Sequence, residues 1–360
     1  MAAPYPPDTA ALIARISLLA TARLGGSVAS VLPVAAGLGS RRFFRLRLEG
    51  ARVDSLIARV EAPEDPKARA PGIPPEPALE PVRAWMEQAD LPVPRSHGSE
   101  DGIDLLEDLG SETLKDAALA ADAAQREALY RAACSLVPRI QRLPVCPGGP
   151  AFERELSPAW IAYKAEEVIR WVLPLSLSRP PRPAEAEALR EAFAGIAEIC
   201  LDAPRRPAHR DFQSTNLLLK RVADAPPQCV MIDLQGAFLA PPEYDLVCLL
   251  RDPHVALSER EVAARVEEVR GQLPDAPDAT TFDTRFTLLG LARCGKDLAR
   301  YLYAASVRGD TRMDACRPAA AASIRSASLR AAAWDLRFER AAELLAPLKD
   351  VFAPPERSDP

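Results

Sequence analysis

The stretch that decides the fold is AHRDFQSTNLLL, residues 208–219. Its polar residues His209, Asp211 and Asn216 have the spacing H-x-D-x-x-x-x-N, and an apolar run follows them. A second apolar run, CVMID, ends at Asp233, and the turn-rich segment ADAPPQ separates the two runs. This pattern predicts a β-hairpin that brings the polar loop and Asp233 together. A polar loop, a hairpin and an aspartate follow one another in the same order in the catalytic region of kinases.

The residue types in this loop suit phosphoryl transfer, which needs positioning and charge neutralisation more than covalent chemistry. Asp211 is placed to orient an acceptor hydroxyl and to take its proton. Asn216 and Asp233 offer the oxygen ligands that Mg²⁺ prefers, and His209 is expected to hold the backbone of the loop. The H-x-D pair alone is common and also fits an ordinary polar surface loop. The hairpin and Asp233 together favour the catalytic interpretation.

The chain after Asp233 limits the kind of acceptor. The segment LQGAFLAPPE leads almost directly into a predicted helix that carries Asp245. Protein kinases need a long activation segment at this point to dock a peptide, and this segment is too short for that purpose. The sequence therefore predicts a small-molecule acceptor.

Outside this region, the first third of the chain is β-rich and the rest is mostly helical. A helix is predicted over 8–23 and another over 79–89, with short strands between them and a proline-dense loop at 62–81. The pattern changes from β-rich to helical near Gly110. Farther along the chain, Ser258 with Glu261 predicts a capping box at the start of a helix. We expect an α+β, bilobal protein-kinase-like fold. Its parts would be a small β-rich N-lobe (1–109), a mainly helical C-lobe (110–350) and a flexible tail (351–360).

Composition excludes several classes of protein. The 360 residues carry a net charge of −5 without a basic block, so neither a nucleic-acid nor a membrane partner is expected. The N-terminal sequence has no signal-peptide pattern, which predicts a cytoplasmic protein. Seven cysteines without a C-x-x-C pair predict buried free thiols, and three histidines without a Cys/His cluster argue against zinc. No obligate protein partner is evident.

The motifs HRDFQSTNLLL, IDLQGA and PPEYDLVCLLRD resemble those of the aminoglycoside phosphotransferase superfamily of small-molecule kinases. Within it, the chain is most similar to bacterial anomeric kinases of N-acetylmuramate and N-acetylglucosamine, which act in cell-wall sugar recycling. SRRFFRL, LLEDLG and FERELSPAW resemble a nucleotide-loop strand, a hinge and an acceptor-pocket helix of that subgroup. The resemblance implies ATP and Mg²⁺ as cofactors and a sugar hydroxyl as the acceptor.

The resemblance also assigns roles to residues in the β-rich part. Gly37, Gly39 and Ser40 would lie over the nucleotide phosphates, although two glycines also fit an ordinary hairpin turn. Glu107 to Leu109 would offer backbone hydrogen bonds to adenine. The strand SLIARVEA lacks the expected phosphate-binding lysine, and Arg59 sits nearest that place. A charged side chain on the solvent face of the strand is an equal alternative for Arg59.

Two further assignments concern charged partners. The acidic partner of Arg59 is left open between Glu76 and Glu80. Asp245 is expected to support the catalytic loop by accepting hydrogen bonds from its backbone or from His209, and a helix-capping role fits equally well.

Recognition of the acceptor is assigned to polar residues beside the matched motifs: Gln213, Gln235, Arg154, Arg251 and Asp252. Solvated positions on helices or loops are the competing interpretation for each of them. Gly236 stands where the sugar kinases would be expected to have an acid. Two other functions stay open. One is a kinase of another small alcohol or an aminoglycoside, whose cationic acceptor would favour a pocket rich in Asp and Glu. The other is a nucleotide-binding pseudokinase.

Overall fold

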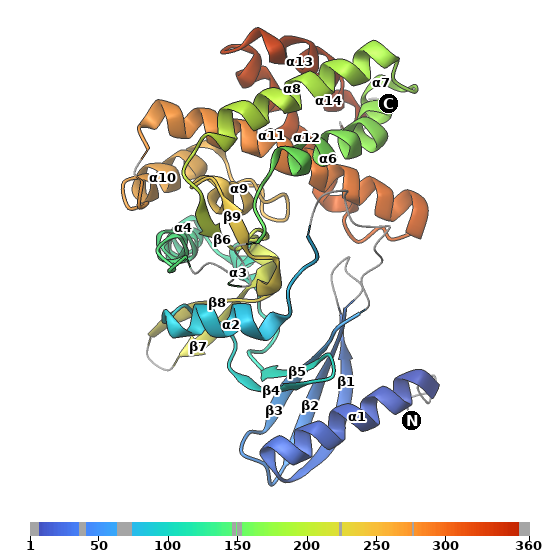
Figure 1. The fold of residues 1–360 in the computed structure, drawn as a ribbon, viewed down its shortest axis with the longest axis vertical. Helices are drawn as coiled ribbons and strands as arrows, with labels where there is room; N and C mark the ends of the chain where they lie inside the picture. Colours follow the sequence, from blue (N-terminus) through green and yellow to red (C-terminus); the bar gives the residue numbers. More distant parts are fainter. Residues whose placement is uncertain are drawn as a thin grey trace, which may run out of the picture.

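The computed structural model describes residues 7–35, 41–62, 74–145, 149, 153–222, 225–275 and 277–352. A β-rich part is followed by a mostly helical part, as the sequence predicts (Figure 1). Within these ranges, no helix combines the length and the apolarity that a membrane crossing requires. The six cysteines in these ranges are all buried and free, which confirms the prediction for them.

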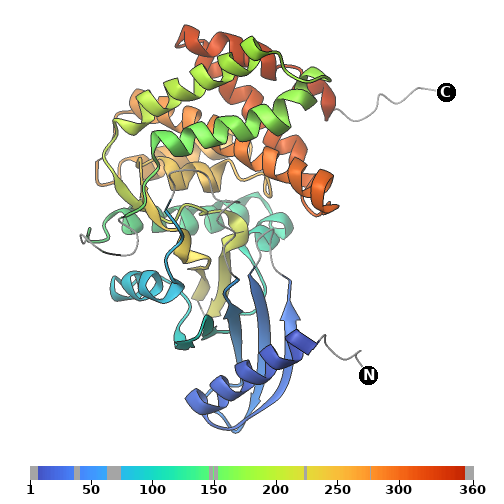
Figure 2. The ribbon, with the colours of Figure 1, turned by 45° about the vertical axis from the view of Figure 1, so that its right-hand side comes forward.

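The β-rich part is a five-stranded antiparallel sheet with the order β1-β2-β3-β5-β4. The strands are β1 (Ser27–Val34), β2 (Arg42–Glu49), β3 (Ser55–Val60), β4 (Ser96–Glu100) and β5 (Ile103–Glu107). In β2, Phe44, Leu46 and Leu48 alternate with more exposed residues, so one face of the sheet is apolar. Helix α1 (Pro7–Leu24) covers that face and forms a small core with it (Figure 2).

Helix α2 (Leu79–Gln88) follows the predicted bounds closely but does not pack in the sheet's core. Its buried residues Leu79, Val82 and Met86 belong to the larger core, which the helical part builds. In Figure 1, α2 lies beside the hairpin strands β7 and β8, apart from α1. The boundary between the lobes at residue 109 stays a prediction. Helix α2 precedes this boundary in the sequence, but it packs against residues of the helical part.

The helical part contains the larger core and one hairpin. Its α-helices are α3 (Leu114–Ala120), α4 (Ala123–Cys134), α5 (Leu136–Gln141), α6 (Pro158–Glu167), α7 (Leu173–Leu177), α8 (Pro183–Leu201), α9 (Tyr244–Leu250), α10 (Glu259–Arg270), α11 (Ala279–Arg308), α12 (Arg317–Ala332), α13 (Glu339–Leu345) and α14 (Leu348–Val351). The short 3₁₀ and π segments are η1 (Val168–Val172), η2 (Ser214–Asn216), η3 (Leu234–Gly236), η4 (Asp314–Cys316) and η5 (Leu336–Phe338). The predicted capping box of Ser258 and Glu261 is present at the start of α10.

The predicted hairpin is formed by β7 (Leu217–Val222) and β8 (Ala225–Met231), which pair in antiparallel register. A second strand pair, β6 (Arg206–Ala208) with β9 (Phe238–Ala240), was not predicted from the sequence. Each of its strands has three residues, which is too short for an alternating pattern to reveal. The two pairs flank residues 209–216, called the catalytic loop below after their predicted role, and the turn that contains Asp233. Both ends of each segment are therefore fixed by a strand.

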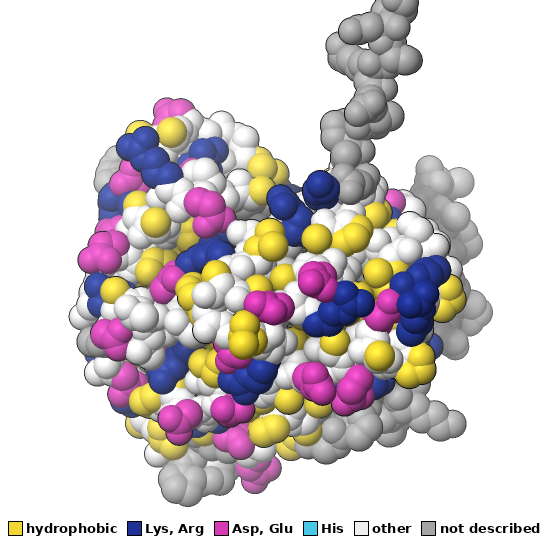
Figure 3. Space-filling model, turned by 90° about the horizontal axis from the view of Figure 1, so that it is seen from above, with side chains coloured by type: hydrophobic (Ala, Val, Ile, Leu, Met, Phe, Trp, Pro, Cys, Tyr) yellow, Lys and Arg dark blue, Asp and Glu magenta, His cyan; other side chains and the backbone are white. Residues whose placement is uncertain are grey.

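The surface at the helical end of the molecule carries charges of both signs. In Figure 3, lysine and arginine side chains are interspersed with aspartate and glutamate over the visible face. The charges on this face therefore do not form a patch of one sign.

Candidate active site

The backbone of the catalytic loop is held by a buried carboxylate of α9. The Asp245 carboxylate accepts hydrogen bonds from the backbone N–H groups of His209, at 2.7 Å, and Arg210, at 3.1 Å. Burial raises the pKa of Asp245 to about 7, and these two hydrogen bonds oppose the rise. Arg210 has a φ of 80°, a left-handed conformation that is costly for a residue with a side chain. The hydrogen bonds therefore hold a loop shape that the chain would not adopt by itself.

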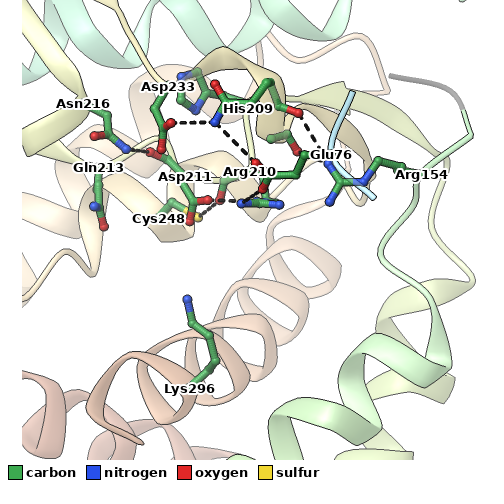
Figure 4. Close-up of polar contacts among 12 residues, drawn as sticks. Glu76, Arg154, His209, Arg210, Asp211, Gln213, Asn216, Asp233, Cys248 and Lys296 are labelled. Atoms are coloured by element: carbon green, nitrogen blue, oxygen red, sulfur yellow. Dashed lines mark hydrogen bonds and ion pairs between the residues drawn. The ribbon is translucent and has the colours of Figure 1, made fainter. Parts of the chain in front are cut away.

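His209 ties the loop to the strand that precedes Asp233. Its Nε2 atom lies 2.9 Å from the backbone oxygen of Ile232, and the backbone N–H of Ile232 donates to the backbone oxygen of Asn216 at 3.0 Å. Burial lowers the pKa of His209, so its ring is neutral. These contacts bring the loop and the Asp233 turn together (Figure 4). His209 thus has contacts suited to a structural role in the loop.

The base candidate, Asp211, lies between two arginines. One carboxylate oxygen pairs with Arg210 Nε at 2.8 Å and the other with Arg293 Nη1 at 2.7 Å. Burial by itself would raise the pKa of Asp211, but Arg210, Arg293 and Lys296 outweigh it and hold the pKa well below the usual value. Asp211 is therefore ionised at neutral pH and fixed in position.

Asn216 and Asp233 supply oxygen ligands from adjoining segments. The Asn216 side-chain N–H donates to the backbone oxygen of Asp211 at 2.8 Å, which leaves the amide oxygen as the atom available for a cation. Asp233 has a left-handed backbone, with φ 63°, and its carboxylate is partly exposed. An amide oxygen and a carboxylate are hard ligands that suit Mg²⁺, which completes its shell with water and phosphate oxygens. The two residues therefore fit a magnesium site.

Gln235 and Arg154, two of the acceptor candidates, pack against the Asp233 turn. The Gln235 amide donates to the Asp233 carboxylate at 2.6 Å, and Gln235 is almost fully buried. Arg154, also buried, donates to the backbone oxygen of Gly236 at 3.3 Å and lies over the ring of Trp160. A Cβ atom on Gly236 would lie about 3.0 Å from the guanidinium of Arg210. Glycine at this position therefore leaves room for the arginine that pairs with Asp211.

The candidates Arg251 and Asp252, at the end of α9, have different surroundings. Asp252 accepts hydrogen bonds from the Ser214 backbone N–H, at 2.7 Å, and from its hydroxyl, at 2.5 Å. It therefore supports the far end of the catalytic loop. The guanidinium of Arg251 pairs with Glu259 at 2.5 Å and lies over the ring of Phe286. No contact in the described part of the chain brings Arg251 to Asp211.

Helix α11 contributes a group of charged residues that the sequence analysis did not single out. Arg293 pairs with Asp297 at 2.8 Å and donates to the side-chain oxygen of Gln213 at 3.3 Å. Lys296 pairs with Asp297 at 2.9 Å and points from α11 toward the loop (Figure 4). On α6, Lys164 is buried against the hydroxyl of Tyr244, at 3.2 Å, and burial lowers its pKa to about 7. Arg293, Lys296 and Lys164 are called the cationic wall below.

A sequence signal for the cationic wall exists in α11. The segment LLGLARCGKDLARYLY has charged residues at positions 293, 296, 297 and 300, and the rest of this segment is largely apolar. These spacings put them on one face. Arg293 and Asp297 are buried, whereas Arg300 is exposed. Buried charges on a helix are a sign of a functional site, because they need partners there.

The nucleotide candidates of the β-rich part are only partly described. Gly37, Gly39 and Ser40 lie outside the described residues. Glu107 ends β5, where its backbone N–H donates to Arg95 and its carboxylate pairs with Lys220 of the hairpin at 2.6 Å. Leu109 follows in the connection to α3. The roles of Glu107 and Leu109 at adenine stay predictions.

Arg59 has neither of the acidic partners that the sequence analysis considered. It is 3% exposed and pairs with Asp104 and Glu61, each at 2.6 Å. Glu76 instead pairs with Arg41 and Arg210, and Glu80 with Arg83. The expectation that Glu76 or Glu80 is the partner of Arg59 is therefore wrong, because Asp104 on the neighbouring strand lies directly opposite Arg59. Cross-strand proximity of this kind cannot be read from one strand alone.

Two kinases from Pseudomonas are similar in sequence to part of this chain. An N-acetylmuramate/N-acetylglucosamine kinase of Pseudomonas putida is 26% identical over 179 residues, which cover 49% of this chain and 49% of that protein. A protein of the same name from Pseudomonas aeruginosa is 26% identical over 252 residues, covering 66% of this chain and 64% of that protein. The chain matches less than two thirds of the length of either relative.

Solved structures with the same fold share little sequence with this chain. A choline kinase from Streptococcus pneumoniae matches with a TM-score of 0.60 at 14% identity, over 90% of this chain and 100% of that one. A gentamicin complex of an aminoglycoside phosphotransferase matches with a TM-score of 0.58 at 10% identity, over 90% and 97%. These likenesses confirm the predicted bilobal kinase-like fold. The model of the phosphotransferase enzyme family matches residues 30–280, and the chain belongs to that family.

Proposed function

We propose that this protein is an ATP-dependent small-molecule kinase that phosphorylates a sugar hydroxyl. The acceptor proposed is the anomeric hydroxyl of N-acetylmuramate or N-acetylglucosamine, in cell-wall sugar recycling. The observation that carries the proposal is the ionised carboxylate of Asp211, which pairs with Arg210 and Arg293. The side-chain amide of Asn216 donates to the backbone oxygen of the same residue, and the Asp233 turn is tied to this loop by backbone hydrogen bonds. Family membership and the names of the two Pseudomonas relatives support the same reaction class.

The residues divide the work of the transfer between them. Asp211 would accept a hydrogen bond from the acceptor hydroxyl and take its proton as the oxygen attacks the γ-phosphorus of ATP. The bond from that phosphorus to the β,γ-bridging oxygen breaks, and ADP leaves. Asn216 and Asp233 would hold Mg²⁺, which neutralises phosphate charge when bound. An anomeric hydroxyl is more acidic than an ordinary alcohol, so a carboxylate of low pKa is an adequate base for it.

The cationic wall supports a neutral or acidic acceptor. Arg293 and Lys296 lie on the side of Asp211 that faces α11, and Asp297 is the acid that pairs with both. An acceptor with several ammonium groups, such as an aminoglycoside, would be repelled by these residues. The lactyl carboxylate of N-acetylmuramate would be attracted by them. N-acetylglucosamine is neutral, so it would be neither attracted nor repelled.

The test is transfer from MgATP to defined acceptors by the purified full chain. We expect sugar 1-phosphates from N-acetylmuramate and N-acetylglucosamine, detected by ³¹P NMR. The methyl glycoside of N-acetylglucosamine has its anomeric hydroxyl blocked and should give no product. Product from this glycoside would show that a hydroxyl other than the anomeric one accepts the phosphoryl group. Product only from choline or an aminoglycoside would overturn the proposed acceptor, and ATP binding without transfer to any acceptor would favour the pseudokinase alternative.

A further inference from the structure

The cation that would contact the nucleotide phosphates is not at the expected place in β3. Arg59, the basic residue of that strand, is buried and fully engaged by Asp104 and Glu61. Its guanidinium would have to leave both carboxylates to reach a ligand, and an unpaired buried charge is costly. The cations beside the loop are also engaged, because Arg210 and Arg293 pair with the Asp211 carboxylate. Lys296 pairs with Asp297 on α11. The phosphate-binding cation is therefore expected on the nucleotide side of Asp233.

Arg41, which directly precedes β2, is surrounded by carboxylates from three segments. Its Nε pairs with Glu61 at 2.9 Å, its Nη2 with Glu76 at 2.5 Å, and its Nη1 lies 3.7 Å from the Asp233 carboxylate. The side chain is 23% exposed, so a ligand can approach it. Arg41 is thus a partly exposed cation beside the carboxylate that we assign to Mg²⁺.

Arg41 is also connected to the base through a chain of alternating charges. Glu76 binds Arg41 with one carboxylate oxygen and Arg210 with the other, at 2.7 Å. Arg210 in turn pairs with Asp211. On its other side, Glu61 bridges Arg41 to Arg59. A carboxylate on each side therefore fixes the orientation of the Arg41 guanidinium relative to both the sheet and the catalytic loop.

We propose that Arg41 is the residue that binds the β- and γ-phosphates of the nucleotide, and that Arg59 only positions it through Glu61. This inference rests on the proposed kinase function and assigns the phosphate contact to a residue outside β3. A guanidinium offers planar, paired donors that suit phosphate oxygens. Asp233 is one of the residues that would hold Mg²⁺, so with the metal bound the guanidinium of Arg41 would keep Glu61 and Glu76 as partners. Its Nη1 edge, which lies 3.7 Å from the Asp233 carboxylate, would then be available to the phosphates.

The test compares nucleotides that differ in phosphate number, with binding measured by calorimetry on the full chain and no acceptor present. Arg41→Met should weaken binding of MgADP and MgATP roughly 10- to 100-fold, the usual loss for a charge-assisted hydrogen bond. AMP lacks the phosphates in question, so its affinity should change much less. A change in general folding would affect all three nucleotides alike. Arg41→Lys should recover part of the affinity for MgATP.

The control is Arg47→Met, which removes an exposed arginine from the same strand β2 and should bind all three nucleotides normally. Equal losses for AMP and MgADP in Arg41→Met, or unchanged MgADP binding, would overturn the assignment. So would a folded Arg59→Met variant that loses more MgADP affinity than Arg41→Met. Arg41→Gln, which keeps a planar donor, provides the same comparison if the methionine variant does not fold. A failure of both sugars as acceptors would not alter these binding results.

Discussion

The catalytic loop and the cationic wall face each other across Asp211, but they are held in place in different ways. The loop is fixed through its backbone, whose N–H groups at His209, Arg210 and Ser214 donate to the buried carboxylates of Asp245 and Asp252. The wall is fixed through side-chain contacts: Arg293 and Lys296 pair with Asp297, and Lys164 donates to the hydroxyl of Tyr244.

In the proposed kinase, this difference would separate the residues that carry out the transfer from those that select the acceptor. Backbone hydrogen bonds preserve the position of the loop whatever acceptor is used. Side-chain pairs on α11 can be exchanged one residue at a time without changing the path of the chain. We therefore expect substitutions in the loop to affect transfer to every acceptor, and substitutions in the wall to affect the choice between acceptors.

The largest effect is expected for Asp211→Asn. The amide keeps the size of the side chain but can neither take the proton nor neutralise Arg210 and Arg293. The value of kcat should fall roughly 10²- to 10⁴-fold for all acceptors, the usual contribution of a general base. Steady-state kinetics with N-acetylmuramate and N-acetylglucosamine measures this loss.

MgATP affinity provides the control for this variant, because Asp211 is assigned no contact with the nucleotide. Binding within a few-fold of the unmodified protein, together with lost transfer, would fit the base assignment. Normal turnover by Asp211→Asn would contradict the assignment of Asp211 as the base. It would also contradict the proposed difference in role between the loop and the wall.

A smaller and selective effect is expected for Lys296→Met. Loss of the ammonium should lower kcat/KM for N-acetylmuramate about tenfold more than for N-acetylglucosamine, since about 1.4 kcal/mol corresponds to that factor. The two sugars differ by the lactyl group, so their ratio isolates the contribution of its carboxylate. Lys349→Met, on the exposed side of α14, is the matched control and should leave the ratio unaltered. A constant ratio in Lys296→Met would show that the wall does not select the acceptor.

The smallest effect on activity is expected for Glu243→Gln, beside the loop-supporting residues of α9. Glu243 is fully buried with Arg285 at 3.7 Å, and burial raises the pKa of its carboxyl to about 7. Because the folded state binds this proton more tightly than the unfolded state, the stability contributed by the protonated form is present below about pH 4.5 and is lost as the pH rises to about 7.

Glutamine stays neutral, so Glu243→Gln should gain stability over the unmodified protein as the pH rises from about 4.5 to 8. The gain should be on the order of 1–3 kcal/mol in the free energy of unfolding, measured by urea denaturation at several pH values. A stability difference that does not vary with pH would contradict the prediction. Unchanged kcat would show that Glu243 affects the helix beneath the loop and not the transfer.

The sequence predicted the features that depend on neighbouring residues. The hairpin, the capping box at Ser258 and the short path from Asp233 to Asp245 follow from local patterns, and the structure contains them. The pair β6 and β9 was missed because three residues carry no period. The packing of α2 in the larger core was also missed, since an amphipathic helix shows that it has a buried face but not which core receives it.

The candidate site also contains residues that the sequence predicts and residues that only the structure reveals. Asp211, Asn216 and Asp233 lie close in the sequence and could be recognised by their spacing. Arg293 reaches Asp211 from a helix 82 positions later, and Arg41 is surrounded by acids from three separate segments. Only the tertiary fold brings such partners together, so a single sequence shows the charges without showing what they pair with.

The existence of two separate cores has a consequence for how the protein opens. Among the residues that the structure describes, thirteen buried apolar side chains hold the sheet to α1, and they form a cluster distinct from the much larger core of the helical part. A region with fewer buried apolar contacts opens at a lower free energy. Under mild heating, the sheet and α1 would therefore unfold before the helical part does. Arg41 would then lose its contacts with Glu76 and Asp233, while α2 and the loop around Asp211 would stay folded.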